Sequence, residues 1–320
     1  MRYTCHYCGN PNVSANDRFC ASCGAPQPKR SPAAGFFLSI LYAVLIYAVM
    51  FIVQNGIVYI YRLIVQEALP YTAFFNESIY YKTYWSVFSK YYAPVCIGIA
   101  LLLLLIYVLF YTLRGKRFER EISLSKMPAA PAAAIFVGGA AAQIVVSVTI
   151  ALLSILFPSL EISGAETNQY YELTFGGGSF ALEVLYIAVI TPILEEVVFR
   201  GLIYTRLRRA MPIAAAQILS ALIFGAAHMN LMQFVYATLT GLFMAYVFEK
   251  YQSIWASILF HIAFNACNYL IVYISSDMLT YSLYFISIAV VLFVLYFVSR
   301  KTSSKINVPV DTIQQERNPL

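Results

Sequence analysis

Long apolar runs constrain this chain more than any other feature, because each is long enough to cross a bilayer as a helix. One crossing needs about 20 predominantly apolar residues. The runs lie near residues 34–60, 93–113, 129–157, 180–204, 213–230, 231–248, 252–273 and 279–299. The chain is 61% hydrophobic and only 11% charged, whereas a soluble globular domain carries about 25% charged residues. The sequence therefore predicts an all-α polytopic membrane protein, with about eight transmembrane helices forming a bundle over 34–300 in the lipid bilayer.

Charge in the connecting segments predicts how this bundle is oriented, since Lys and Arg favour the cytoplasmic side of a membrane. Segment 114–126 carries five Lys or Arg residues, whereas 158–178 carries none and is expected to be an outer loop. The basic stretches at 204–209 and 300–305 should also lie inside. Eight spans with both termini in the cytoplasm satisfy all of these positions. We therefore expect a multi-pass cell-membrane protein with a cytoplasmic tail over 301–320. The net charge of +6 is scattered and gives no indication of nucleic-acid binding.

The N-terminal segment carries a strong metal-binding pattern. Four cysteines are spaced C-x2-C-x11-C-x2-C, namely Cys5, Cys8, Cys20 and Cys23. Two such Cys pairs close a tetrahedral site with no open position, which predicts a structural Zn²⁺. The bland alternative is four unrelated thiols in an unfolded head. The segment has no apolar run of the kind a signal peptide needs, so we expect it to stay in the cytoplasm. The sequence thus predicts a zinc ribbon over 1–25 and a Pro-rich linker over 26–33.

A few polar residues interrupt the apolar runs, and ionisable groups at membrane depth are expensive enough to suggest a functional site. They are Glu195, Glu196, Arg200, His228, His261 and Asn265. Glu196 and Arg200 are four residues apart, so they share a helix face and can form an ion pair. That pairing leaves Glu195 on a face about 100° away, free to act as a general base. Pro192, one turn earlier, predicts a kink near these acids.

His261 and Asn265 also share a helix face, and Asn268 extends that face by one turn. An imidazole N–H and an amide aimed at one point can stabilise an oxyanion. Phe224 and His228 are again four residues apart, so the ring can pack on the imidazole or line a groove. Each residue alone has a plainer interpretation: a packed histidine, a structural ion pair, or an asparagine that joins helices.

Three short motifs give this set a family resemblance. "EEVVFRG" fits Glu-Glu-x-x-x-Arg, "FGAAH" fits Phe-x-x-x-His, and "HIAFN" fits His-x-x-x-Asn. In this order they resemble the CPBP family, which includes CAAX prenyl proteases, the Ras-converting enzyme and bacteriocin-processing proteins. The resemblance covers about 180–270 and implies a helical intramembrane endopeptidase with its cavity open toward the cytoplasm.

The resemblance also implies roles. Glu195 would activate water with the help of His228, His261 and Asn265 would stabilise the oxyanion, and Glu196 with Arg200 would fix the helix geometry. The implied substrate is a membrane-associated protein or peptide. The N-terminal segment itself resembles zinc-ribbon modules of bacterial membrane proteins, which indicates a bacterial source and a ribbon that recruits a protein partner or substrate.

Two kinds of alternative stay open at this point. Glu195, His228 and His261 could bind a catalytic Zn²⁺, as in a metalloprotease. We favour a site without a metal, because the histidines lack the H-E-x-x-H spacing and Asn265 suits an oxyanion better than a ligand shell. The chain could instead be a non-catalytic bacteriocin-immunity or scaffold protein of the same fold, or a transporter that relays protons through the Glu and His residues.

Overall fold

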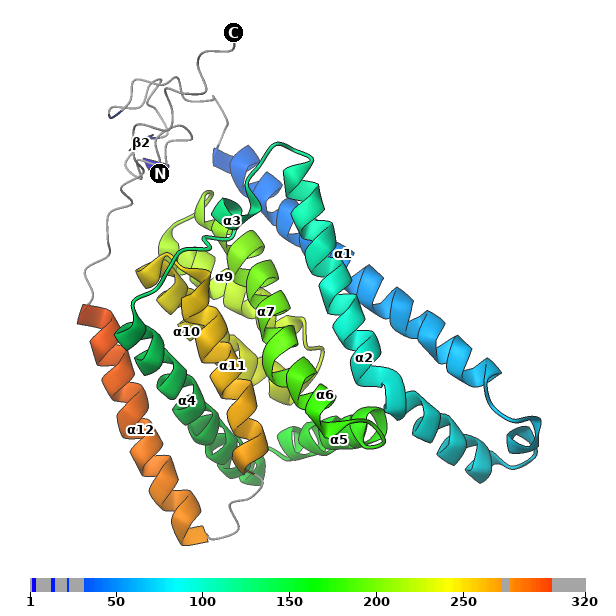
Figure 1. Ribbon diagram of the computed structural model, residues 1–320. Helices are drawn as coiled ribbons and strands as arrows, with labels where there is room; N and C mark the ends of the chain where they lie inside the picture. Colours follow the sequence, from blue (N-terminus) through cyan, green and yellow to red (C-terminus); the bar gives the residue numbers. More distant parts are fainter. Residues whose placement is uncertain (1, 4–12, 15–21, 23–31, 272–276, 301–320) are drawn as a thin grey trace.

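The computed structural model describes residues 2–3, 13–14, 22, 32–271 and 277–300. Helices form nearly all of this part (Figure 1). They are α1 (Pro32–Glu67), η1 (Tyr71–Phe75), α2 (Glu77–Thr112), α3 (Phe118–Glu121), α4 (Ala129–Leu156), α5 (Pro158–Phe175), α6 (Phe180–Val184), η2 (Leu185–Ile190), α7 (Thr191–Glu196), η3 (Val197–Tyr204), α8 (Thr205–Arg208), α9 (Ile213–Ala226), α10 (Leu231–Tyr251), α11 (Ile254–Ile271) and α12 (Asp277–Arg300). Two short strands, β1 (Arg2–Tyr3) and β2 (Val13–Ser14), pair antiparallel. The predicted zinc ligands Cys5, Cys8, Cys20 and Cys23 and the tail 301–320 lie outside the described residues.

In the part of the chain that the structure describes, five helices are long and apolar enough to cross a membrane, which supports the predicted helical, multi-pass protein. They are Gly35–Glu67, Glu77–Thr112, Ala129–Leu156, Leu231–Tyr251 and Leu279–Arg300. The other three predicted spans are also helical. The span predicted over 180–204 is divided into short helical segments over 180–208. The span predicted over 213–230 is shortened to the 14 residues of α9. The span predicted over 252–273 corresponds to the 18 residues of α11. The predicted count of eight crossings is therefore not confirmed.

Among the predicted boundaries, two differ most from the structure. The second span was expected to begin at 93, but α2 begins at Glu77 because the Asn76 side chain accepts a hydrogen bond from the Ile79 N–H and caps the helix. Segment 158–178 was expected to be a loop, but residues 158–175 form α5, with Pro158 at its first position. Its polar composition hid the helix, which is held by packing against its neighbours.

Residues 180–208 form one continuous helical run through α6, η2, α7, η3 and α8. The segments η2 and η3 are π-helical, and they lie on either side of α7. Pro192, near the start of α7, has no backbone N–H, so an undisturbed α-helix cannot pass through this position. Near Pro192, where the sequence predicted a kink, the helical run contains two π-helical segments, and such segments are frequent at functional sites.

Helices α4 and α11 pack closely, and α12 lies along the outer side of α4 (Figure 1). Gly139 permits the first contact, because a Cβ at this position would overlap the backbone carbonyl of Phe260. Because α11 carries His261 and Asn265, this close approach helps to position the candidate site.

Candidate active site

A cavity of about 790 Å³ lies among α4, α5, η2, α7, α10 and α11. Four residues singled out from the sequence line it: Glu195, His228, His261 and Asn265. They come from α7, from the turn after α9, and from α11. The structure therefore brings together the four predicted catalytic residues from three helical segments.

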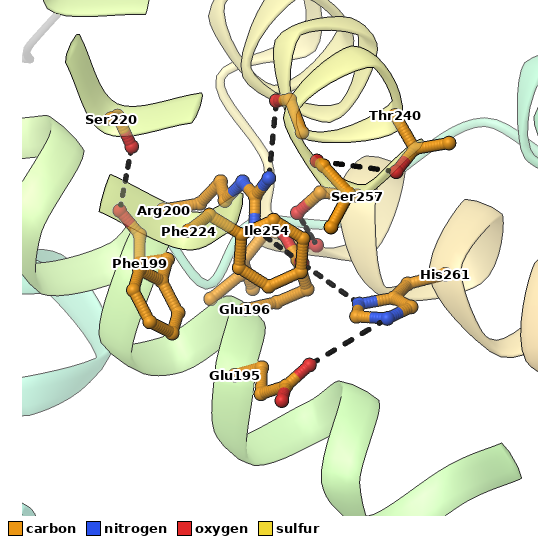
Figure 2. Close-up of polar contacts among 12 residues, drawn as sticks. Glu195, Glu196, Phe199, Arg200, Ser220, Phe224, Thr240, Ile254, Ser257 and His261 are labelled. Atoms are coloured by element: carbon orange, nitrogen blue, oxygen red, sulfur yellow. Dashed lines mark hydrogen bonds and ion pairs between the residues drawn. The ribbon is translucent and has the colours of Figure 1, made fainter. Parts of the chain in front are cut away.

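Glu196 and Arg200 form the expected ion pair, and neither side chain lines the cavity. Nη1 of Arg200 is 2.8 Å from Oε1 of Glu196, and both side chains are 0% exposed. Nη2 of Arg200 also donates to the Gly241 carbonyl at 3.1 Å, and the guanidinium stacks over the Phe224 ring at 4.3 Å. A buried ion pair is stable only when such additional contacts offset its desolvation. The pair therefore braces α7 and η3 against α10 and α9 (Figure 2).

The imidazole of His261 contacts both of the adjacent glutamates, one through each ring nitrogen (Figure 2). Its Nδ1 is 3.0 Å from Oε1 of Glu196, and its Nε2 is 3.7 Å from Oε2 of Glu195. Glu196 already accepts a hydrogen bond from Arg200, so its carboxylate accepts a second one from the His261 Nδ1–H. The Glu195 side chain is 20% exposed and reaches the cavity. The neighbouring acids thus differ: Glu196 orients the imidazole of His261, and Glu195 lines the cavity beside it.

His228 lies in the turn between α9 and α10. Its Nδ1 is 2.9 Å from the Phe224 carbonyl oxygen, which can only accept, so Nδ1 carries the hydrogen. In the neutral ring, Nε2 then keeps a lone pair. The predicted span over 213–230 is too long, because α9 ends at Ala226. The following turn is held by α5, since Nδ2 of Asn230 donates to the Ser163 carbonyl at 3.3 Å.

Asn265 is held by a backbone group that Pro192 leaves without a donor. In η2 the Thr191 N–H bonds to the Tyr186 carbonyl, five residues earlier. The same pattern would pair the Ile187 carbonyl with residue 192, but proline has no N–H. Nδ2 of Asn265 donates to that carbonyl instead, at 3.0 Å. Because an amide nitrogen carries two hydrogens, the other N–H stays available to a ligand in the cavity.

The aromatic ring of Phe224 packs against both histidines of the site. Its centroid is 5.0 Å from that of His228 and 5.8 Å from that of His261, both in edge-to-face geometry. The ring also lines the cavity and packs under the Arg200 guanidinium. The predicted packing of Phe224 on His228 is therefore present, together with contacts that the sequence did not indicate.

The cavity also contains polar residues that the sequence analysis missed. Nε2 of Gln143 on α4 donates to Oδ1 of Asn268 at 3.1 Å, and the Tyr269 hydroxyl donates to Oε1 of Glu183 at 3.1 Å. A single Gln in the apolar run "AAAQIVV" and a single Glu in "FALEV" were the available signals. Neither belongs to a motif, so only the folded arrangement shows that both line the same cavity.

The cavity lies in the half of the bundle that faces away from the basic residues. A separate cleft is lined by Tyr42 and by cationic side chains such as Arg114 and Arg206. Gln54, which lines the cavity, is about 18 Å further along α1 than Tyr42, and Tyr92 is about 33 Å from Arg114 along α2. In Figure 1 the basic segment around α3 is at the upper end of the bundle, and α5 and α6 are at the lower end.

The position of the cavity can be compared with the expected orientation of the bundle in the membrane. Exposed aromatic residues occur at the edge of the cavity near α5 and α6, where Tyr170 and Phe180 are 45% and 60% exposed. Glu196 and Arg200, which follow Glu195 in the helical run, do not line the cavity. A bundle with its basic end in the cytoplasm therefore has this cavity in its outer half, which does not agree with the cytoplasmic opening that the family resemblance implied.

The described residues contain no group of three or more His, Cys, Asp or Glu side chains arranged to hold a metal ion. Nδ1 of His228 and Nδ1 of His261 make hydrogen bonds to Phe224 and Glu196. We derive no step through a metal.

Part of the chain is similar to known proteins. Residues 177–267 match the family described as "Type II CAAX prenyl endopeptidase Rce1-like". Over 84 residues the chain is 30% identical to the Bacillus subtilis (strain 168) protein named "Putative membrane peptidase YdiL", a match that covers 26% of this chain and 34% of that protein. The chain thus spans about a third of the length of this curated relative. No solved structure gave a significant match. The matched family and the named relative support a membrane peptidase, as predicted from the motifs.

Proposed function

We propose that this chain is an intramembrane endopeptidase that hydrolyses a peptide bond of a membrane-associated protein or peptide with water activated by Glu195. One observation carries the proposal. Glu195 reaches the cavity beside His261, whereas Glu196, its neighbour in sequence, is fully buried and paired with Arg200. The site therefore holds one carboxylate in a structural role and leaves one available for chemistry.

The proposed reaction is a general-base hydrolysis. Glu195 accepts one proton from a water molecule, which His228 helps to hold through the lone pair on Nε2. The water oxygen forms a bond to the substrate carbonyl carbon, and the carbonyl oxygen becomes an oxyanion. Glu195 then returns the proton to the leaving nitrogen as the C–N bond breaks, which gives a carboxylic acid and an amine.

Two donors are available for the oxyanion. Asn265 offers the N–H that is not bonded to the Ile187 carbonyl. His261 offers Nε2–H only in its imidazolium form, because its Nδ1–H is directed to Glu196. In that form the ring lies 3.0 Å from Glu196 and 3.7 Å from Glu195.

The proposal is tested by comparing cells that carry the wild-type chain with cells that carry Glu195→Ala. Mass spectrometry of membrane-protein termini should reveal new N- and C-termini that appear only with the wild-type chain. Identical termini in both strains, at equal amounts of both chains in the membrane, would contradict it and would favour a non-catalytic role.

We also propose that Cys5, Cys8, Cys20 and Cys23 bind a structural Zn²⁺ and that the resulting ribbon recruits a protein partner or substrate. The cysteine spacing supports this, and β1 and β2 pair on either side of the first cysteine pair in the sequence. The purified full chain should contain stoichiometric zinc, and Cys5→Ser should lose it. A wild-type chain without zinc would contradict the proposal.

A further inference from the structure

The cavity carries an unbalanced negative charge. Glu183 and Glu195 both line it, and no Lys or Arg occurs among the described residues of its wall. Glu196 differs, because Arg200 neutralises it outside the cavity. A carboxylate that is partly withdrawn from water is stabilised by an opposite charge within a few ångströms. The cavity is therefore matched to a cationic ligand rather than to an anionic one.

Glu183 has the geometry of a binding group. It is partly buried in α6, and its one recorded polar partner among the described residues is the neutral Tyr269 hydroxyl, at 3.1 Å. Tyr269 also packs edge-to-face on Phe180, with centroids 5.7 Å apart. The Tyr269 hydroxyl thus fixes one oxygen of the carboxylate, and the second oxygen can accept a hydrogen bond from a ligand.

The distance between the two acids sets the spacing that a substrate would need. Glu183 precedes Glu195 by twelve positions in the same helical run, or about 18 Å at the rise of an α-helix. An extended peptide covers that distance in about five residues. A lysine or arginine side chain is long, so we expect its position within about three to six residues of the cleaved bond.

We propose that Glu183 binds a lysine or arginine side chain of the substrate, and that this contact selects an internal basic segment of a polypeptide for cleavage. This rests on the proposed endopeptidase function. A substrate that presented its free C-terminal carboxylate to the cavity would meet two acids and, among the described residues of the wall, no Lys or Arg, and it would be disfavoured.

The test uses the purified full chain and a peptide library made by digesting a proteome with a glutamate-specific protease, so that internal lysines and arginines remain. Mass spectrometry identifies the cleaved bonds. The wild-type chain should show Lys or Arg enriched at one fixed position near the bond. Glu183→Gln keeps an acceptor for Tyr269 but lacks the charge, so the preference should fall about five- to tenfold while other peptides are still cleaved.

Two control variants separate the possible outcomes. Tyr269→Phe removes the hydrogen bond to Glu183 but keeps the charge, and it should keep the basic preference. Glu195→Gln should lower the cleavage of all peptides by about 10²–10⁴-fold. Equal preference in the wild type and Glu183→Gln would overturn the Glu183 subsite while leaving the endopeptidase standing. No cleavage by the wild-type chain would overturn both proposals.

Discussion

Nε2 of His261 and Oε2 of Glu195 lie 3.7 Å apart, at the wall of a cavity enclosed by membrane helices. This separation is too long for a direct hydrogen bond. On its other side the same imidazole contacts Glu196 at 3.0 Å, and that carboxylate is held by Arg200. Glu196 therefore holds the ring at Nδ1. The other nitrogen, Nε2, is near the carboxylate of Glu195, which lines the cavity and forms no ion pair with an arginine among the described residues.

The first prediction concerns the unequal roles of the adjacent acids in stability. Glu196→Gln leaves the Arg200 charge buried without its partner, which should lower the free energy of unfolding by about 3–5 kcal/mol. Glu195→Gln is the matched control, because Glu195 is partly exposed and has no ion pair with Arg200. It should change the free energy of unfolding by less than about 1 kcal/mol. Thermal unfolding in detergent measures both, and equal losses would contradict the assignment.

The second prediction concerns Pro192. Pro192→Ala restores a backbone N–H that can bond within the helix, so the Ile187 carbonyl no longer depends on Asn265. We expect cleavage to fall about tenfold, since the amide loses its fixed position, while the folded state is kept. Pro94→Ala makes the same change within α2, where Pro94 is exposed and does not line the cavity, and it should leave activity unaltered. Full activity of Pro192→Ala would show that Asn265 does not need this anchor.

The third prediction concerns the close contact of α4 with α11. In Gly139→Ala the new methyl group meets the Phe260 carbonyl, so the helices must separate, at a cost of about 1–3 kcal/mol in the free energy of unfolding. Gly98→Ala is the control, because no atom lies within 4 Å of the added methyl group. It should be neutral or slightly stabilising, since alanine favours a helix. Similar unfolding temperatures for the two variants would contradict the packing.

The fourth prediction concerns orientation. Phe180 lies at the cavity edge and is 60% exposed, whereas Leu113 is 85% exposed near the basic cleft. If the basic end is cytoplasmic, a membrane-impermeant maleimide should label Phe180→Cys in intact cells and Leu113→Cys only after permeabilisation. The unmodified chain controls for its native cysteines. The reverse pattern would place the cavity on the cytoplasmic side, as the family resemblance implied.

The sequence predicted those features that depend on local spacing. The apolar runs predicted helices, and the interval of four residues predicted the pairing of Glu196 with Arg200. It did not predict α5, because a polar segment such as "GAETNQYYELT" is helical here only through its packing against other helices. Nor did it predict that His261 would contact Glu196, since this depends on how two helices far apart in the chain approach each other.

Asn265 shows the same limit at a single residue. Its spacing from His261 correctly placed both residues in one cavity. Its bond to the Ile187 carbonyl arises from the π-helical turn around Pro192, and no local pattern in α11 contains that information.

The claim that Glu195 activates water is tested most directly by the purified chain reconstituted in lipid vesicles with the same peptide library. The account predicts that the wild-type chain cleaves peptides and that Glu195→Gln lowers the rate by about 10²–10⁴-fold, the usual contribution of a general base, with its unfolding temperature unchanged. Cleavage by Glu195→Gln at the wild-type rate would contradict the account.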